Sequence, residues 1–165
     1  MKLKYISWLP AVIIMAIIFY FSSKPATISG ESSLMISQTI LNAYEDITDL
    51  SYEELARQQV LLELDHIVRK TAHFIEYAIL AAAWVMHFIT WKNDFRFVLG
   101  LSVLITSVYA ATDEFHQTFV VGRSGQISDV LLDSCGAVVG ALFLLSLNLI
   151  RKKLWNKHIE AKKLQ

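Results

Sequence analysis

The sequence predicts an all-α membrane protein: a polytopic bundle of four transmembrane helices with a longer external helical segment between the first and second spans. Hydrophobic residues make up 55% of the chain and charged residues 18%, whereas roughly a quarter of residues are charged in soluble proteins. The apolar residues also form long uninterrupted runs, which is typical of membrane spans. Formal net charge is zero, so composition gives no case for a nucleic-acid partner.

Four apolar runs are expected to cross the bilayer, whose core needs about 20 apolar residues in a helix. We expect the first run to be a retained helix, because no small-residue cleavage site follows it. The third is short unless it extends into the polar sequence after it. The predicted spans cover about residues 5–21, 74–91, 97–116 and 130–150.

Lysine and arginine in the connecting segments predict that both ends of the chain are cytoplasmic. With the N-terminus inside, most of the fifteen basic residues fall in the cytoplasm, many of them in a basic tail over residues 151–165. Most of the fifteen acidic residues then lie outside. We interpret residues 1–165 as a single membrane domain, because the chain has no internal repeat or low-complexity stretch.

The external segment, about residues 22–69, is expected to be helical. Ser51-Tyr52-Glu53-Glu54 resembles a capping box that opens a helix, and this helix could run directly into the second span. A shorter amphipathic helix is expected before it, either on the outer membrane surface or capping the bundle. Its apolar residues are Leu34, Ile36, Ile40, Leu41, Tyr44 and Ile47.

Ionisable residues gather near the outer ends of three predicted spans. On the second predicted helix, Arg69, His73, Glu76 and Tyr77 are spaced by four, three and one residues, so they share one helix face. The set comprises Arg69, His73, Glu76 and Tyr77, then Asp113, Glu114, His116 and Gln117, and finally Asp129 and Asp133. Charges inside a bilayer are costly unless they pair, bind an ion or face water. The sequence therefore predicts an external functional site, with Lys70 and Glu114 expected to be solvated.

Three chemistries suit this cluster. The candidates for general acid–base catalysis are His73, Glu76, Asp113 and His116. Arginine binds phosphate or carboxylate with two parallel hydrogen bonds, so Arg69 and Arg123 could bind an outer-leaflet lipid. The candidates for substrate binding are Arg69, Arg123, Asp129, Gln117, Tyr77 and Ser22. A divalent metal is the third option, without a tight ligand signature to support it. The structural alternative is a polar network that only fixes helix packing.

Three further residues carry predictions about packing. Cys135 is the only cysteine, which excludes an internal disulfide, and we expect it to be a small packing residue. Gly136 and Gly140 have the small-xxx-small spacing that permits close helix contact. His87 is expected near the cytoplasmic interface, away from the polar cluster.

The polar residues, in their order, resemble the VanZ-like membrane protein family over about Tyr5 to Ile150. The motifs are Phe21-Ser22-Ser23-Lys24-Pro25, Arg69-Lys70-Thr71-Ala72-His73-Phe74-Ile75-Glu76-Tyr77, Asp113-Glu114-Phe115-His116-Gln117-Thr118-Phe119-Val120-Val121-Gly122-Arg123, and Asp129-Val130-Leu131-Leu132-Asp133. Two positions depart from the family pattern: Val121 stands where proline is common, and Asp133 where asparagine is frequent.

The resemblance implies a multi-pass protein of the bacterial cell membrane with a role in the cell envelope. The family is named for a member linked to resistance to the glycopeptide teicoplanin. Our leading hypothesis is an outer-facing site that binds or modifies a lipid head group or a cell-wall precursor; the residues fit either catalysis or binding alone. The alternatives are a proton- or ion-coupled transporter, which would require a homo-oligomer, and a structural or regulatory membrane partner.

Overall fold

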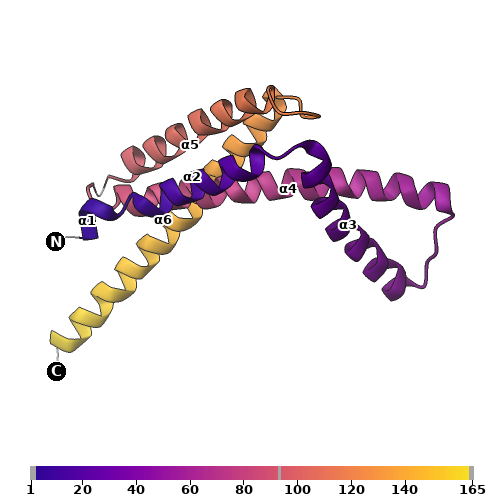
Figure 1. Ribbon diagram of the computed structural model, residues 1–165. Helices are drawn as coiled ribbons and strands as arrows, with labels where there is room; N and C mark the ends of the chain where they lie inside the picture. The colour runs from indigo at the N-terminus through magenta and orange to yellow at the C-terminus, as the bar shows by residue number, and fades with distance from the viewer. Residues whose placement is uncertain (1–2, 93, 164–165) are drawn as a thin grey trace.

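The computed structural model describes residues 3–92 and 94–163, and within these ranges it contains helices, turns and loops but no strand. Four helices, α2, α4, α5 and α6, pack together as a bundle (Figure 1). The predicted all-α fold is therefore confirmed. The helices are α1 (Leu3–Ile6), α2 (Leu9–Ser22), α3 (Ala26–Thr48), α4 (Glu54–Phe88), α5 (Phe95–Gln117) and α6 (Ile127–Lys163).

Within the described ranges, three helical segments are long and apolar enough to cross a bilayer: Lys4–Ser22, Phe95–Gln117 and Ile127–Lys162. They contain the first, third and fourth predicted spans, and the third extends into polar sequence as expected. The second predicted span lies in α4, which is not among these three segments because it is less apolar on average. Glu76 and His87 lower the mean hydropathy of this stretch. The three apolar segments indicate a membrane protein.

Helix α4 runs without interruption from the segment after α3 into the bundle, as the sequence allowed. Its 35 residues correspond to about 52 Å, well beyond a bilayer core of about 30 Å. The predicted capping box is wrong, because Glu53 occupies the N-cap position and no side chain caps the helix. Ser51 lies too far before the first turn to serve as the cap.

Helix α3 begins at Ala26, so it is longer than the predicted amphipathic helix, and it packs against the first half of α4. Asp49 ends α3 in the left-handed conformation (φ 52°). Across the hairpin, the Arg57 guanidinium donates to Glu45 at 3.2 Å and to Asn42 at 2.6 Å. The two helices diverge from the bundle on one side (Figure 1).

Helices α4 and α6 make the most extensive contact in the bundle. It is close because glycine faces the backbone of α4: a Cβ on Gly136 would lie 3.2 Å from Phe74 Cα, and one on Gly140 would lie 2.6 Å from Ala78 Cα. The predicted close contact at these two glycines is confirmed. Cys135 is exposed, so its predicted packing role is wrong; the neighbouring Gly136 occupies the packed face instead.

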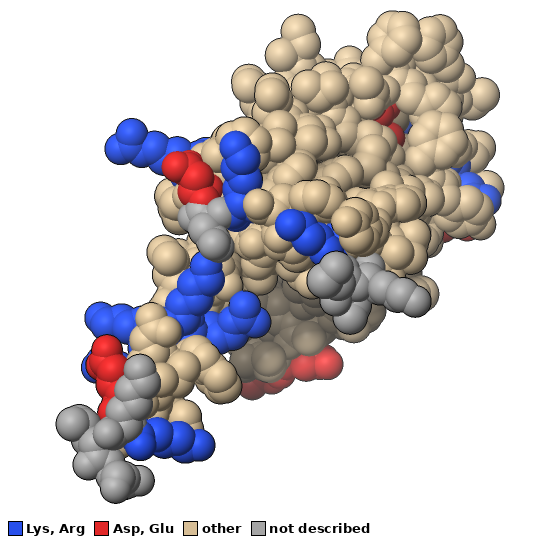
Figure 2. All heavy atoms as spheres, turned by 90° about the vertical axis from the view of Figure 1, so that its left-hand side faces the viewer, with Lys and Arg blue, Asp and Glu red and all other residues tan. Residues whose placement is uncertain are grey.

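The bundle has two chemically different ends. At the first, which we call the basic end, Ser7 Oγ lies 2.9 Å from His87 Nδ1 and Lys4 Nζ lies 4.2 Å from the centre of the Trp91 ring. The α4–α5 turn and the C-terminal half of α6 lie on this side, and lysine and arginine side chains gather there (Figure 2). Lys2, predicted to be cytoplasmic, is outside the described residues. We call the opposite end, at the α5–α6 turn, the polar end.

Candidate functional site

The buried carboxylate of Asp113 is the centre of the polar end. Asp113, on α5, is 3% exposed. Its Oδ2 accepts hydrogen bonds from Ser22 Oγ at 2.7 Å, Tyr77 OH at 3.1 Å and Gln117 Nε2 at 3.2 Å. Three donors from α2, α4 and α5 therefore converge on one oxygen, while Oδ1 has no partner among the described residues. Four predicted site residues are thus brought together.

Local sequence explains why Ser22 reaches this point. Pro25 disfavours helical conformation in the residue before it, so α2 ends at Ser22 and leaves its hydroxyl facing α5. On the other side, Gly122 adopts φ 77° in the turn after α5, a conformation that glycine tolerates without a Cβ penalty. The Ala26 N–H then donates to the Val121 carbonyl at 3.2 Å, which joins this turn to the start of α3.

Next to the Asp113 network, His73 and Glu76 extend from α4. Both lie within electrostatic range of Asp113 and Arg123. His73 Nδ1 is buried and has no hydrogen-bond partner among the described residues. Buried polar atoms are nearly always hydrogen-bonded, so this nitrogen is an unsatisfied polar group at the polar end.

Two arginines also belong to the polar end. The Arg123 guanidinium, in the α5–α6 turn, donates to the Phe21 carbonyl at 3.3 Å. Burial lowers the pKa of Arg123 from its usual value, and the charge of Arg69 adds to this effect, although Asp113 opposes it. Arginine nevertheless stays charged in proteins. Arg69 pairs with Asp65 at 3.4 Å and keeps 47% of its side chain exposed, so two cations stand within electrostatic range of each other.

His116 occupies a different environment from the other catalytic candidates. Its Nε2 lies 3.3 Å from Ser23 Oγ, and its ring stacks on Phe19 with centroids 4.7 Å apart. It belongs to the α2–α5 contact rather than to the hydrogen-bond network of Asp113.

Lys70 and Glu114, both expected to be solvated, have partners instead. Lys70 forms an ion pair with Asp129, which joins α4 to the first turn of α6. Glu114 is 4% exposed, and its Oε2 accepts the Gln126 N–H at 2.9 Å. The two acids therefore hold the start of α6 against α4 and α5. The expectation of solvation is wrong for Glu114, whereas Lys70 keeps 29% of its side chain exposed in its ion pair.

We expect the Lys70–Asp129 pair to make a measurable but modest contribution. Both side chains keep about a quarter of their surface exposed, 29% and 26%, which screens the attraction. A double-mutant cycle with Lys70→Ala and Asp129→Ala should give a coupling energy of about 1 kcal/mol. Thermal unfolding of the four proteins measures this energy, and additive effects of the two substitutions would contradict the pair.

Asp133 differs from the other acids at this end. It is fully buried, and neither of its carboxylate oxygens has a hydrogen-bond partner among the described residues. It lies one helical turn after Asp129 and within electrostatic range of Glu114, Asp113 and Glu76. In residues 3–92 and 94–163, no group of three or more histidine, cysteine, aspartate and glutamate side chains is placed to hold a metal ion. The metal option therefore lacks a ligand set there.

Comparison with known proteins agrees with the motifs. A family model described as VanZ/LLP1 matches residues 7–150, a range that contains every residue of the polar end discussed above. No curated protein and no solved structure matches the chain.

Proposed function

The chain belongs to the VanZ/LLP1 family, and we propose that it is a four-span protein of the bacterial cell membrane. Its polar end faces outward and binds the phosphate-bearing head group of an envelope lipid or a lipid-linked cell-wall precursor. The observation that carries this proposal is that two arginines lie at the same end of the bundle as buried polar groups without hydrogen-bond partners. Arg123 lies within electrostatic range of both Arg69 and His73, and the Nδ1 of His73 has no partner among the described residues.

The proposed orientation follows from the separation of charge between the two ends. Lysine and arginine favour the cytoplasmic side of membrane proteins, and they gather at the basic end (Figure 2). Placing that end in the cytoplasm puts both ends of the chain there too. Helix α4 then supplies the remaining span, the second along the chain, from about residue 74 to its end at Phe88. The cost of Glu76 is reduced by its position near the outer interface.

The proposed ligand follows from the chemistry of the arginines. A guanidinium presents a planar fork of donors that matches phosphate oxygens. Charge-assisted hydrogen bonds of this kind are stronger than those between two neutral groups. The exposed part of Arg69 opens the site to the outer membrane surface. His73 and Glu76 add a second capability, because they could transfer a proton to or from the bound group.

The test compares ligand-induced stabilisation of wild type and Arg123→Gln, purified in a non-ionic detergent. The probes are a polyprenyl-diphosphate-linked cell-wall precursor and phosphatidylglycerol, each added over a range of concentrations. We expect at least one probe to raise the melting temperature of wild type, with a dissociation constant about tenfold higher in Arg123→Gln. A tenfold loss corresponds to about 1.4 kcal/mol, which is close to the lower limit for a hydrogen bond to a charged group.

Arg57→Gln is the matched control, since it removes the same charge from the α3–α4 hairpin, where Arg57 binds Glu45 and not the residues of the polar end. It should bind both probes as wild type does. If neither probe stabilises wild type, or if Arg57→Gln and Arg123→Gln weaken binding equally, the site is not where we place it.

The proposed role in the envelope, including the link to teicoplanin, is tested by growth of bacteria that express wild type or Glu76→Ala in the presence of the antibiotic.

One observation favours a purely structural role as the second candidate. Asp113 is nearly inaccessible and has three donors on one oxygen, which is what a packing network between helices requires. In that case His73→Ala and Glu76→Ala would lower melting temperature without changing any probe's affinity. The transporter alternative has no comparable support, because the polar groups gather at one end and transporter sites usually lie near the midplane.

A further inference from the structure

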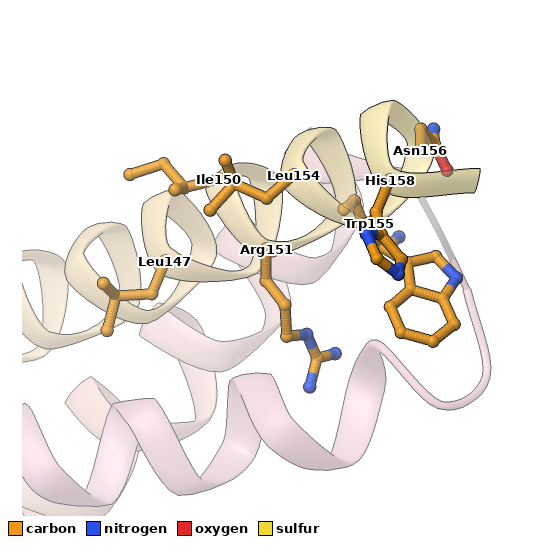
Figure 3. Close-up of a pocket in the computed structure, with 8 residues that line it drawn as sticks. Leu147, Ile150, Arg151, Leu154, Trp155, Asn156 and His158 are labelled. Atoms are coloured by element: carbon orange, nitrogen blue, oxygen red, sulfur yellow. The ribbon is translucent and has the colours of Figure 1, made fainter. Parts of the chain in front are cut away.

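A concavity on the C-terminal half of α6 lies at the basic end, far from the residues considered so far. It has a volume of about 820 Å³. Leu147, Ile150 and Leu154 form its apolar part, and Arg151 and Trp155 contribute the charged and aromatic parts. Figure 3 shows Leu147, Arg151 and Trp155 extending from the same side of the helix. Lys152 also lines the concavity, so the surface combines an apolar strip with two cations.

The length of α6 places this concavity at a particular depth. The apolar run over residues 130–150 corresponds to about 31 Å of helix, which matches the thickness of a bilayer core. Arg151 then emerges at the level of the lipid phosphates, and Trp155 lies at the interface, where tryptophan is enriched. Arg151 is held in place by its own helix, since its Nη2 donates to Asn148 Oδ1 at 3.1 Å.

We propose that this concavity binds an anionic phospholipid of the leaflet at the basic end. The lipid phosphate contacts Arg151, and an acyl chain lies along Ile150 and Leu147, which lie on the membrane-core side of Arg151. The fork of guanidinium donors matches a phosphate, and the apolar strip continues towards the membrane core, as an acyl chain does. Lys153 and Lys157 add long-range attraction to an anionic surface. The proposal requires α6 to span the membrane but does not depend on the function of the polar end.

The experiment uses the full chain in a non-ionic detergent and two probes, phosphatidylglycerol and phosphatidylcholine with the same acyl chains. Melting temperature is followed against lipid concentration for wild type, Arg151→Gln and Lys153→Gln. Both substitutions remove one positive charge from the same exposed tail, but only Arg151 lines the concavity. We expect wild type to prefer phosphatidylglycerol, Arg151→Gln to bind it about fivefold more weakly, and Lys153→Gln to change binding less than twofold.

Equal weakening by Arg151→Gln and Lys153→Gln would overturn the proposal, because it would indicate diffuse attraction rather than a site. Equal affinity of wild type for the two lipids would also overturn it. If Arg151→Gln melts early without lipid, Trp155→Ala provides the second variant, and it should lose affinity for the same lipid. Arg123→Gln should leave this preference unchanged, which separates the result from any binding at the polar end.

Discussion

Replacing Gly140 with alanine should lower the melting temperature of the protein by roughly 6–12 °C, which corresponds to about 3 kcal/mol for a chain of this size. A Cβ at this position would lie 2.6 Å from Ala78 Cα, with the Ala78 carbonyl closer still. Backbone cannot rotate away as a side chain can, so α4 and α6 must separate along their contact. Overpacking of a well-packed interior typically costs about 1–3 kcal/mol and sometimes more.

Gly100→Ala is the matched control for this substitution. Gly100 is also a helix glycine, on α5, but a Cβ there would meet nothing within 4 Å. Because alanine is favoured over glycine in helix interiors by roughly 0.5–1 kcal/mol, this variant should melt at the wild-type temperature or slightly above it. Gly136→Ala should also be destabilising, since a Cβ there would lie 3.2 Å from Phe74 Cα.

Thermal unfolding in detergent, followed by circular dichroism or by intrinsic tryptophan fluorescence, measures all three variants. Equal melting temperatures for Gly140→Ala and Gly100→Ala would contradict the close helix contact. A loss in both variants would indicate that alanine is disfavoured at helix glycines of this chain in general, and the specific role of the α4–α6 crossing would then be wrong.

For Gly136 and Gly140, the sequence could predict a close helix contact but not the partner in that contact. The small-xxx-small spacing of Gly136 and Gly140 predicted a close approach, because spacing of four residues puts both on one helix face. Spacing says nothing about the partner, and the backbone of α4 at Phe74 and Ala78 was not identifiable from it. Cys135 was misjudged for the same reason: small size suits packing, but position on the helix decides it.

At the polar end, too, the sequence predicted which residues lie together but not all of their partners. Helical periodicity and the order of the spans predicted that Ser22, Tyr77, Asp113 and Gln117 lie together, and they do. The partners of Glu114 depend on how the chain turns between α5 and α6. The carboxylate of Glu114 accepts a hydrogen bond from a backbone N–H twelve residues later. A pattern of side chains in the sequence cannot predict such a contact. The Gly122 turn was the available signal that these two segments approach each other.

Helix α4 explains why apolar length alone was an incomplete guide. Its predicted span was read from a run that contains Glu76 and His87, and the same residues that indicated a site reduce its apolar character. The start of α4 was misplaced because Ser51 and Glu54 satisfy the sequence pattern of a capping box, whereas the chain enters the helix two residues later. Cap geometry depends on backbone direction, which the residue types do not specify.

The second large effect is expected at Asp113, where alanine should reduce stability by about 3 kcal/mol. The substitution leaves the hydroxyls of Ser22 and Tyr77 and the amide of Gln117 without their common acceptor. Each unsatisfied buried donor costs about 1–3 kcal/mol. Removal of a buried carboxylate also relieves its own desolvation, which keeps the expected loss below the sum of three bonds. Asp46→Ala, at an exposed position on α3, is the control and should change stability by less than about 0.5 kcal/mol.

A double-mutant cycle with Ser22→Ala identifies the network as the cause. Ser22→Ala alone should cost about 1 kcal/mol, since one bond to a charged acceptor is lost and two donors remain paired. In the Asp113→Ala background the serine hydroxyl already lacks its acceptor, so its removal should cost nothing or restore some stability. The coupling energy is then about 1 kcal/mol or more. Strict additivity would mean that Ser22 and Asp113 act separately, and α2 would then owe its position at the polar end to its apolar contacts alone.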